Sequence, residues 1–194
     1  MDSLKISEST IQTIFESQFI DIVFDKTEWD KPAPIGKYAS RLWNYNNKNK
    51  HPVSVDIARV NKHNSKNIFF FELKINIALA FSQCGYILLG SQLYHKEYNA
   101  TVHPYMVTLC DNLFSEELIA SLPIFASSNS LRNTDLINPF QIKTGLGFIF
   151  LQIDKTNKSI DKIHIKDIPS GISLAGMAKK AGINAHLFCN KCTN

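Results

Sequence analysis

The chain has 194 residues, a hydrophobic content of 44% and a net charge of +4, values that describe one globular domain of ordinary size rather than a disordered chain. No apolar run reaches the length of a transmembrane helix and the N-terminus lacks the basic and apolar regions of a secretory signal, so we expect a cytoplasmic protein that does not enter a membrane. The sequence contains neither a glycine-rich phosphate-binding loop nor a Gly-x-Ser-x-Gly nucleophile motif.

Residues 1–25 contain the first predicted element, an amphipathic helix that Ser7 or Ser9 could cap. Two of its acids are candidate functional residues. Glu8 falls angularly within the apolar stripe, but it also lies in the first turn, where a carboxylate suits the helix dipole. Glu16 lies at the edge of the stripe and further into the helix, so the sequence does not decide between the two acids. The residues on the apolar face are Ile11, Ile14, Phe15, Phe19, Ile22 and Val23.

A basic segment interleaved with aromatic residues follows at residues 26–50, and Pro32 breaks any helix near its start. Basic side chains among aromatic rings can contact phosphates and stack on bases. Lys37 and Arg41 are therefore candidate nucleic-acid contacts. The alternative is a loop whose aromatic residues anchor it on the core.

Two short apolar runs, residues 53–60 and 68–75, predict neighbouring buried strands joined by a polar link that suits a hairpin. Asp56 lies in the first run, and Glu72 and Lys74 lie in the second. Because Glu72 and Lys74 are two residues apart, they face the same side of their strand. Charged side chains therefore stand in strands that are otherwise hydrophobic.

Buried charges are costly unless they are paired or bind a metal. Two carboxylates beside a lysine suit a Mg²⁺-dependent phosphodiester hydrolase, because acids hold this hard cation through oxygen. The lysine would orient or activate water, or neutralise the developing charge on the phosphate. The alternative is a salt bridge between charges on half-buried strands.

Asp56 followed by Glu72-x-Lys74, on the second and third strands of a mixed sheet, resembles the PD-(D/E)xK nuclease superfamily, which includes most type II restriction enzymes. Val55 precedes Asp56, so the proline-aspartate pair of the superfamily is absent. The resemblance covers residues 1–110. It implies an α/β fold with a restriction-endonuclease-like α/β/α core, in which helices flank a mixed central sheet.

The resemblance also implies a metal site. Asp56, Glu72 and the main-chain carbonyl of Leu73 would hold Mg²⁺, with Mn²⁺ as a substitute. The superfamily often draws an additional acid from its first helix, and Glu8 or Glu16 could supply it here.

Residues 76–95 predict a long helix, and the next apolar run predicts a strand that begins near Tyr105, because Pro104 cannot donate into the interior of a ladder. In the superfamily the helix after the Glu-x-Lys strand often carries a glutamine near the catalytic centre. Gln83 with the downstream Tyr86, or Gln92 with Tyr94, is similar in type, and the resemblance implies Gln83 as a possible additional site residue. An exposed helix position is the alternative for Gln83.

The second half of the chain predicts a helix at residues 115–122 and a strand at residues 145–153, which we expect at a sheet edge. We place a domain boundary after residue 154, so that residues 1–154 form the nuclease-like domain. Residues 155–194 carry seven lysines and two aspartates, a local balance of +5 that leaves the remainder at −1. We expect this segment to be a small, basic, helical appendage.

Residues 172–184 resemble the first helix and turn of a helix-turn-helix, and a second helix would run through His186. Lys179 and Lys180 are accordingly candidate nucleic-acid contacts. The alternative is a terminal helix pair that packs on the core. One CxxC at residues 189–192 does not supply the four ligands of a structural zinc site.

Taken together, these features predict a Mg²⁺-dependent endonuclease that cleaves double-stranded DNA in restriction, phage defence or a mobile element. Asp56, Glu72 and Lys74 would be catalytic, and a homodimer would supply two active sites for two strands. RNA is a further substrate that the motif allows. The alternative function is a module with the same fold that binds nucleic acid or a protein without cutting, in which Asp56 and Lys74 form a structural ion pair.

Overall fold

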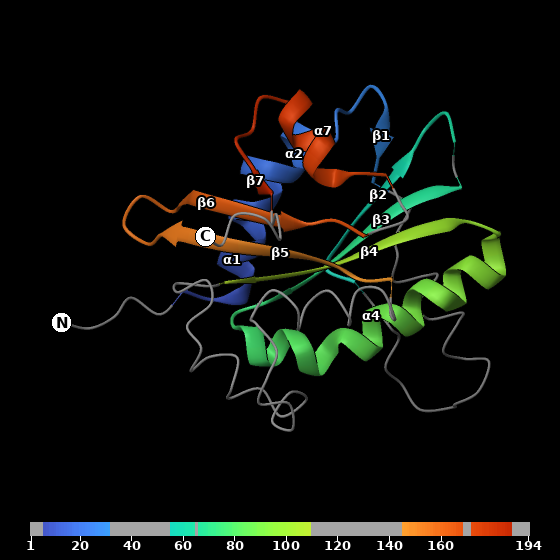
Figure 1. Ribbon diagram of the computed structural model, residues 1–194, viewed down its shortest axis with the longest axis horizontal. Helices are drawn as coiled ribbons and strands as arrows, with labels where there is room; N and C mark the ends of the chain where they lie inside the picture. Colours follow the sequence, from blue (N-terminus) through green and yellow to red (C-terminus); the bar gives the residue numbers. More distant parts are fainter. Residues whose placement is uncertain (1–5, 32–54, 65, 110–144, 169–171, 188–194) are drawn as a thin grey trace, which may run out of the picture.

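A mixed β-sheet forms the centre of the computed structural model, and its seven described strands stand side by side in the order in which they occur in the sequence (Figure 1). The structure describes residues 6–31, 55–64, 66–109, 145–168 and 172–187. The strands are β1 (Trp29–Asp30), β2 (Ile57–Asn61), β3 (Asn67–Lys74), β4 (Thr101–Leu109), β5 (Gly147–Asp154), β6 (Ser159–Lys166) and β7 (His186–Leu187).

The three central strands β3, β4 and β5 are parallel, and the strands on either side of them are antiparallel to their central neighbours. Helix α4 (Ile77–Tyr98) connects β3 to β4, as a parallel pair requires a crossover connection. Because parallel strands end at the same edge of a sheet, the carboxyl ends of β3, β4 and β5 lie along one edge.

Helices cover both faces of the sheet, so the chain has the α/β class that the sequence predicts (Figure 1). Helix α4 packs on one face, with its apolar side chains against β2 to β5. The opposite face is covered by the N-terminal helical segment and by a C-terminal helix. These elements are α1 (Glu8–Phe15), the π-helical turn η1 (Glu16–Ile20), α2 (Asp21–Val23) and α7 (Leu174–Lys180).

Strand β3 sends alternate side chains to the two faces, which decides where its charges lie. Phe69, Phe71 and Leu73 are fully buried in the core beneath α1 and α7. Glu72 and Lys74 therefore lie on the side of the sheet that α4 covers. Leu73 faces away from the two charges, and this confirms the prediction that Glu72 and Lys74 share one side of their strand.

The π-helical turn changes the face that the N-terminal segment buries. The main-chain N–H of Asp21 donates to the carbonyl of Glu16, five residues earlier, which is the hydrogen bond of a π-helix. The wider turn brings Ile20 into the core, fully buried, and leaves Ile22 48% exposed. The prediction that Ile22 lies on the apolar face is wrong, because it assumed uninterrupted α-helical spacing.

A buried arginine fastens this segment to the sheet. Arg59 of β2 donates through Nη2 to Glu16 Oε1 at 2.9 Å and to Asp21 Oδ1 at 3.0 Å, and its Nη1 donates to the carbonyl of Ala58. One π turn places Glu16 and Asp21 on the same side of the segment, where both meet one guanidinium. Lys31 also pairs with Glu16, but the lysine is exposed.

Strand β4 begins at Thr101, earlier than the predicted start near Tyr105. Pro104 lies inside the strand, where it is paired with Phe70 of β3. Pairing between β4 and β5 begins only at Tyr105 opposite Gly147. The Thr101 N–H donates to the Lys66 carbonyl on the β3 side, and N–H positions alternate between the two sides of a strand, so the Pro104 nitrogen faces away from β3. Among the described residues, β4 has no strand neighbour there at Pro104, so the missing N–H interrupts no ladder bond.

The described C-terminal residues belong to the same sheet and core, which corrects the prediction of a helical appendage. Strand β6 pairs with β5, so β5 is an interior strand rather than an edge, and β7 pairs with β6. Ile163 and Ile165 of β6 are buried beside Leu174 of α7. Residues 186–187 form β7, so the second helix that we expected through His186 is replaced by a strand.

Tyr105 connects the centre of the sheet to α7. Its fully buried ring lies so close to Gly147 that a Cβ atom at position 147 would collide with it. The Tyr105 hydroxyl donates to Asp167 Oδ1 at 2.9 Å, and Asp167 also accepts from the Ser173 hydroxyl and the Leu174 N–H at the start of α7. Burial raises the pKa of Tyr105, so the hydroxyl remains a donor.

We expect Arg59→Met to lower the free energy of unfolding by about 3 kcal/mol, because it leaves two carboxylates beside an apolar core without their cation. Urea denaturation measures this change. The matched control is Lys31→Met, whose exposed pairing with Glu16 should be worth less than about 1 kcal/mol. We call the contacts of Arg59 with Glu16 and Asp21 the Arg59 clamp. Equal effects of the two substitutions would show that this clamp stabilises the fold no more than the exposed pair of Lys31 and Glu16 does.

Candidate active site

Asp56, Glu72 and Lys74 meet at one edge of the sheet, at the carboxyl end of β3. Strands β2 and β3 are antiparallel, so Asp56, which immediately precedes β2, lies beside the end of β3. Asp56 Oδ2 accepts a hydrogen bond from the main-chain N–H of Leu73 at 2.7 Å. The structure thus brings together the three residues that the sequence places on neighbouring strands.

The Lys74 ammonium lies at the centre of this group. Its Nζ is 2.8 Å from Glu72 Oε1 and 3.9 Å from Asp56 Oδ2. It also donates to the main-chain carbonyl of Leu73 at 2.6 Å. Only 13% of the Lys74 side chain is exposed, so these oxygens replace much of the water that would otherwise solvate the charge.

Glu8 is the helix acid that joins the group. Its Oε1 is 3.3 Å from Lys74 Nζ. Ser7 is the N-cap of α1, and its side chain accepts the N–H of Thr10, so Glu8 is the first helical residue and not the cap. Its carboxylate lies in the first turn, where the helix dipole favours it, and also contacts the lysine.

Glu16, the other helix acid considered, lies in the Arg59 clamp and not in the site. The sequence had left these two acids undecided. Three carboxylates from three separate segments, Glu8, Asp56 and Glu72, therefore share the Lys74 ammonium.

Gln12 is a supporting residue that our sequence analysis missed. Its Nε2 donates to the main-chain carbonyl of Asp56 at 3.1 Å, which fixes the segment just before β2. Gln12 lies four residues after Glu8, and residues at this spacing share one side of a helix. That spacing is the signal in the sequence that could have indicated it.

The acids of the site are held at an electrostatic cost. Burial raises the pKa of Asp56 and of Glu72, and the neighbouring Asp56 charge raises that of Glu72 further. Burial alone would lower the pKa of Lys74, but its hydrogen bond to Glu72 and the surrounding acids raise it. One ammonium faces three acids, so the ammonium is well stabilised while the acids are only partly compensated.

Glu16 shows the opposite balance. Burial would raise its pKa, but hydrogen bonds from Lys31 and Arg59 outweigh burial and lower it. The Arg59 clamp therefore stabilises its charged acid, whereas the group around Lys74 does not fully stabilise its own acids. Residues that are kept charged at a cost are candidates for function.

The remaining predicted contacts lie elsewhere. Gln83 is partly buried on α4, and within the described part of the chain it makes no hydrogen bond to the site. Lys179 and Lys180 are exposed on α7, on the face of the sheet opposite Glu72. Residues 37 and 41 lie outside the described residues, as do the predicted helix at 115–122 and the terminal CxxC.

The oxygen donors suit a hard divalent cation by their chemistry, because carboxylates and main-chain carbonyls are the ligands that Mg²⁺ and Mn²⁺ prefer. Asp56, Glu72 and the Leu73 carbonyl are such donors. Among the described residues, no group of three or more His, Cys, Asp or Glu side chains could hold a metal ion as it stands. The Lys74 ammonium is the cation that these oxygens surround in this structure.

No protein-family model matches the chain, and no curated protein or solved structure is significantly similar to it. Within the described residues, no helix combines the length and apolar character needed to cross a membrane.

We expect the stability deficit of Lys74→Met to depend on pH. The carboxyl pKa values are raised in the folded chain, so the folded state binds more protons than the unfolded state, and the free energy of unfolding falls as pH rises through these pKa values. Removal of the ammonium raises the carboxyl pKa values further. Urea denaturation should show a deficit of about 3 kcal/mol at pH 8 that shrinks at pH 5, whereas a constant deficit would contradict this account.

Proposed function

We propose that the chain is a metal-dependent nuclease that hydrolyses phosphodiester bonds of DNA, in restriction, phage defence or a mobile element. The observation that carries the proposal is the convergence of Glu8, Asp56 and Glu72 on Lys74 at the carboxyl edge of a mixed sheet. This arrangement is consistent with the resemblance of Asp56 and Glu72-x-Lys74 to the PD-(D/E)xK superfamily.

The spatial arrangement supports the proposal beyond the short sequence motif. A chance occurrence of the motif would not require its residues to meet, nor an acid from α1 to join them. The carboxyl ends of the strands in open α/β sheets are where ligands commonly bind. Glu72 and Asp56 have raised pKa values because of burial, which a purely stabilising ion pair does not require.

In this proposal Asp56, Glu72 and the Leu73 carbonyl hold Mg²⁺ or Mn²⁺. The bound ion would polarise the scissile phosphate and the attacking water. Lys74 keeps its proton at neutral pH because its pKa is raised, so it serves to neutralise phosphate charge and to orient water rather than to accept a proton. A carboxylate with a raised pKa is the better proton acceptor.

The alternative is a module that binds nucleic acid or protein without cutting. One observation favours it: Glu72 and Lys74 form a close ion pair at 2.8 Å. In that case Asp56 and Lys74 are structural, and metal ions have no effect. The two functions differ in whether metal ions affect the protein and in whether variants at Asp56 lose stability.

We expect Asp56→Asn to reduce Mg²⁺- or Mn²⁺-dependent cleavage of plasmid DNA by about 100-fold or more, with EDTA abolishing the wild-type activity. Its stability at pH 7 should equal or exceed that of the wild type, because burial disfavours the charge that the substitution removes and Asn can still accept the Leu73 N–H. Agarose-gel assays and thermal unfolding measure the two effects.

Asp21→Asn is the matched control, since it makes the same chemical change at the Arg59 clamp and should leave cleavage intact. Wild-type protein that cuts no plasmid, single-stranded DNA or RNA, and that melts at a temperature independent of Mg²⁺, would support the binding module instead. Cleavage of RNA alone would retain the chemistry and change the substrate.

We expect Glu8→Gln to raise the Mg²⁺ concentration needed for half-maximal cleavage by about 10- to 100-fold. Glu8 pairs with Lys74, and Lys74 contacts the proposed metal ligands Asp56 and Glu72. Cleavage rates across a Mg²⁺ titration measure this. Glu16→Gln is the control, and it should lower stability through the Arg59 clamp without changing the Mg²⁺ requirement. An unchanged Mg²⁺ requirement in Glu8→Gln would show that Glu8 does not support metal binding.

A further inference from the structure

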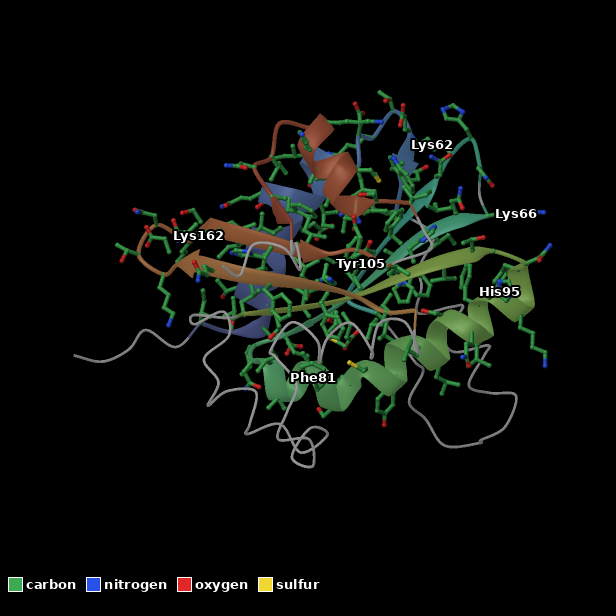
Figure 2. The ribbon with its side chains drawn as sticks, viewed as in Figure 1. Lys62, Lys66, Phe81, His95, Tyr105 and Lys162 are labelled. Atoms are coloured by element: carbon green, nitrogen blue, oxygen red, sulfur yellow. The ribbon has the colours of Figure 1, made fainter. Side chains whose placement is uncertain are left out.

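The β5–β6 hairpin lies at the same edge of the sheet as the candidate active site. Strands β3 and β5 are both parallel to β4, so the end of β5, where the hairpin turns, lies along the edge at which β3 ends. Two strands separate β3 from β6. Three strand spacings place β6 roughly 14 Å from β3. Figure 2 shows Lys162 at the hairpin.

The turn of this hairpin is built by its own side chains. Asp154 Oδ1 accepts the N–H groups of Thr156 and Asn157 at 2.8 and 3.1 Å, and its Oδ2 accepts from the Asn157 amide at 2.6 Å. Lys158 has a left-handed φ of 51°, an uncommon conformation for a residue other than glycine. These contacts fix where the turn presents its side chains.

Gln18 of η1 anchors the hairpin to the helical layer. Its Nε2 donates to the carbonyl of Lys158 at 3.1 Å, and its Oε1 accepts the N–H of Ile160 at 2.8 Å. Both hydrogen-bonding groups of one amide side chain are therefore used on the hairpin backbone. This pair of bonds spans the sequence from the first helical segment to the second half of the chain.

The anchored hairpin carries exposed positive charge. Lys155, Lys158 and Lys162 are all exposed. Of the nearby acids, Asp154 is engaged in its own turn and Asp161 is exposed beside Lys162, so three lysines and two aspartates leave the hairpin with a net charge of +1. Lys162 precedes the buried Ile163, so it lies on the face of the sheet that also carries Glu72 and Lys74.

We propose that the β5–β6 hairpin is a phosphate-binding clamp that holds the backbone of duplex DNA beside the active site, through Lys158 and Lys162. The proposal rests on the proposed function, because a phosphodiester at Lys74 would continue as a strand with a negative charge at every nucleotide. Lys74 is level with His164 across the sheet, so Lys162 and Lys158 also lie further along the hairpin than Lys74 does. At about 3.4 Å of helix rise per nucleotide, the hairpin lysines would reach phosphates roughly four to six nucleotides from the scissile bond.

The test measures binding of a fluorescent duplex DNA by anisotropy across a range of salt concentrations, with EDTA present so that no cleavage occurs. The variant is Lys158→Gln with Lys162→Gln. The matched control is Lys66→Gln with Lys96→Gln, which removes the same charge from two exposed lysines at the opposite edge of the sheet, where β3 begins and α4 ends. Each lost phosphate contact should reduce the slope of log affinity against log salt by about 0.9.

We expect the hairpin variant to bind more weakly with a slope reduced by about 1.8, and the control variant to retain the wild-type slope. Equal slopes in the two variants would overturn the clamp and leave the proposed nuclease intact. A wild-type protein that does not bind the duplex at all would overturn both the clamp and DNA as the proposed substrate.

Discussion

The positive charge of Lys74 is what allows three acids to approach one another at the edge of the sheet. Glu8, Asp56 and Glu72 come from different segments, and their mutual repulsion would separate them without a cation between them. The ammonium compensates them only in part, which is why burial still raises the pKa values of Asp56 and Glu72. A divalent ion that took over this neutralisation would free Lys74 to interact with a phosphate.

The N-terminal helical segment connects this site to the Arg59 clamp. Glu8, Gln12 and Glu16 follow one another at intervals of four residues, and they contact Lys74, the Asp56 carbonyl and Arg59 in turn. The π turn begins only at Glu16, so the helical spacing between the first and last of these contacts is preserved. The position of Glu8 beside Lys74 therefore depends on how Arg59 holds Glu16 and Asp21, later in the same segment.

Hydrophobic patterning predicted the part of the site that lies on strands. Asp56, Glu72 and Lys74 stand in apolar runs whose alternation fixes their side of the sheet, so their meeting follows from local sequence. Glu8 could not be chosen from helical angles, because its partner is brought to it by tertiary packing. Ile22 was misplaced because hydrophobic periodicity carries no signal for a π turn. Strand β6 was missed because its segment was interpreted from its basic charge and not from the alternating isoleucines Ile163 and Ile165.

The contact between Tyr105 and Gly147 limits how this chain can diverge. The ring fills the space that a side chain at position 147 would need, and its hydroxyl is bound to Asp167, so it cannot swing aside without releasing the start of α7. Substitution at 147 would thus require simultaneous changes in two other elements. Among homologous chains with this architecture, glycine should persist at this position while the lysines of the exposed hairpin exchange with arginine.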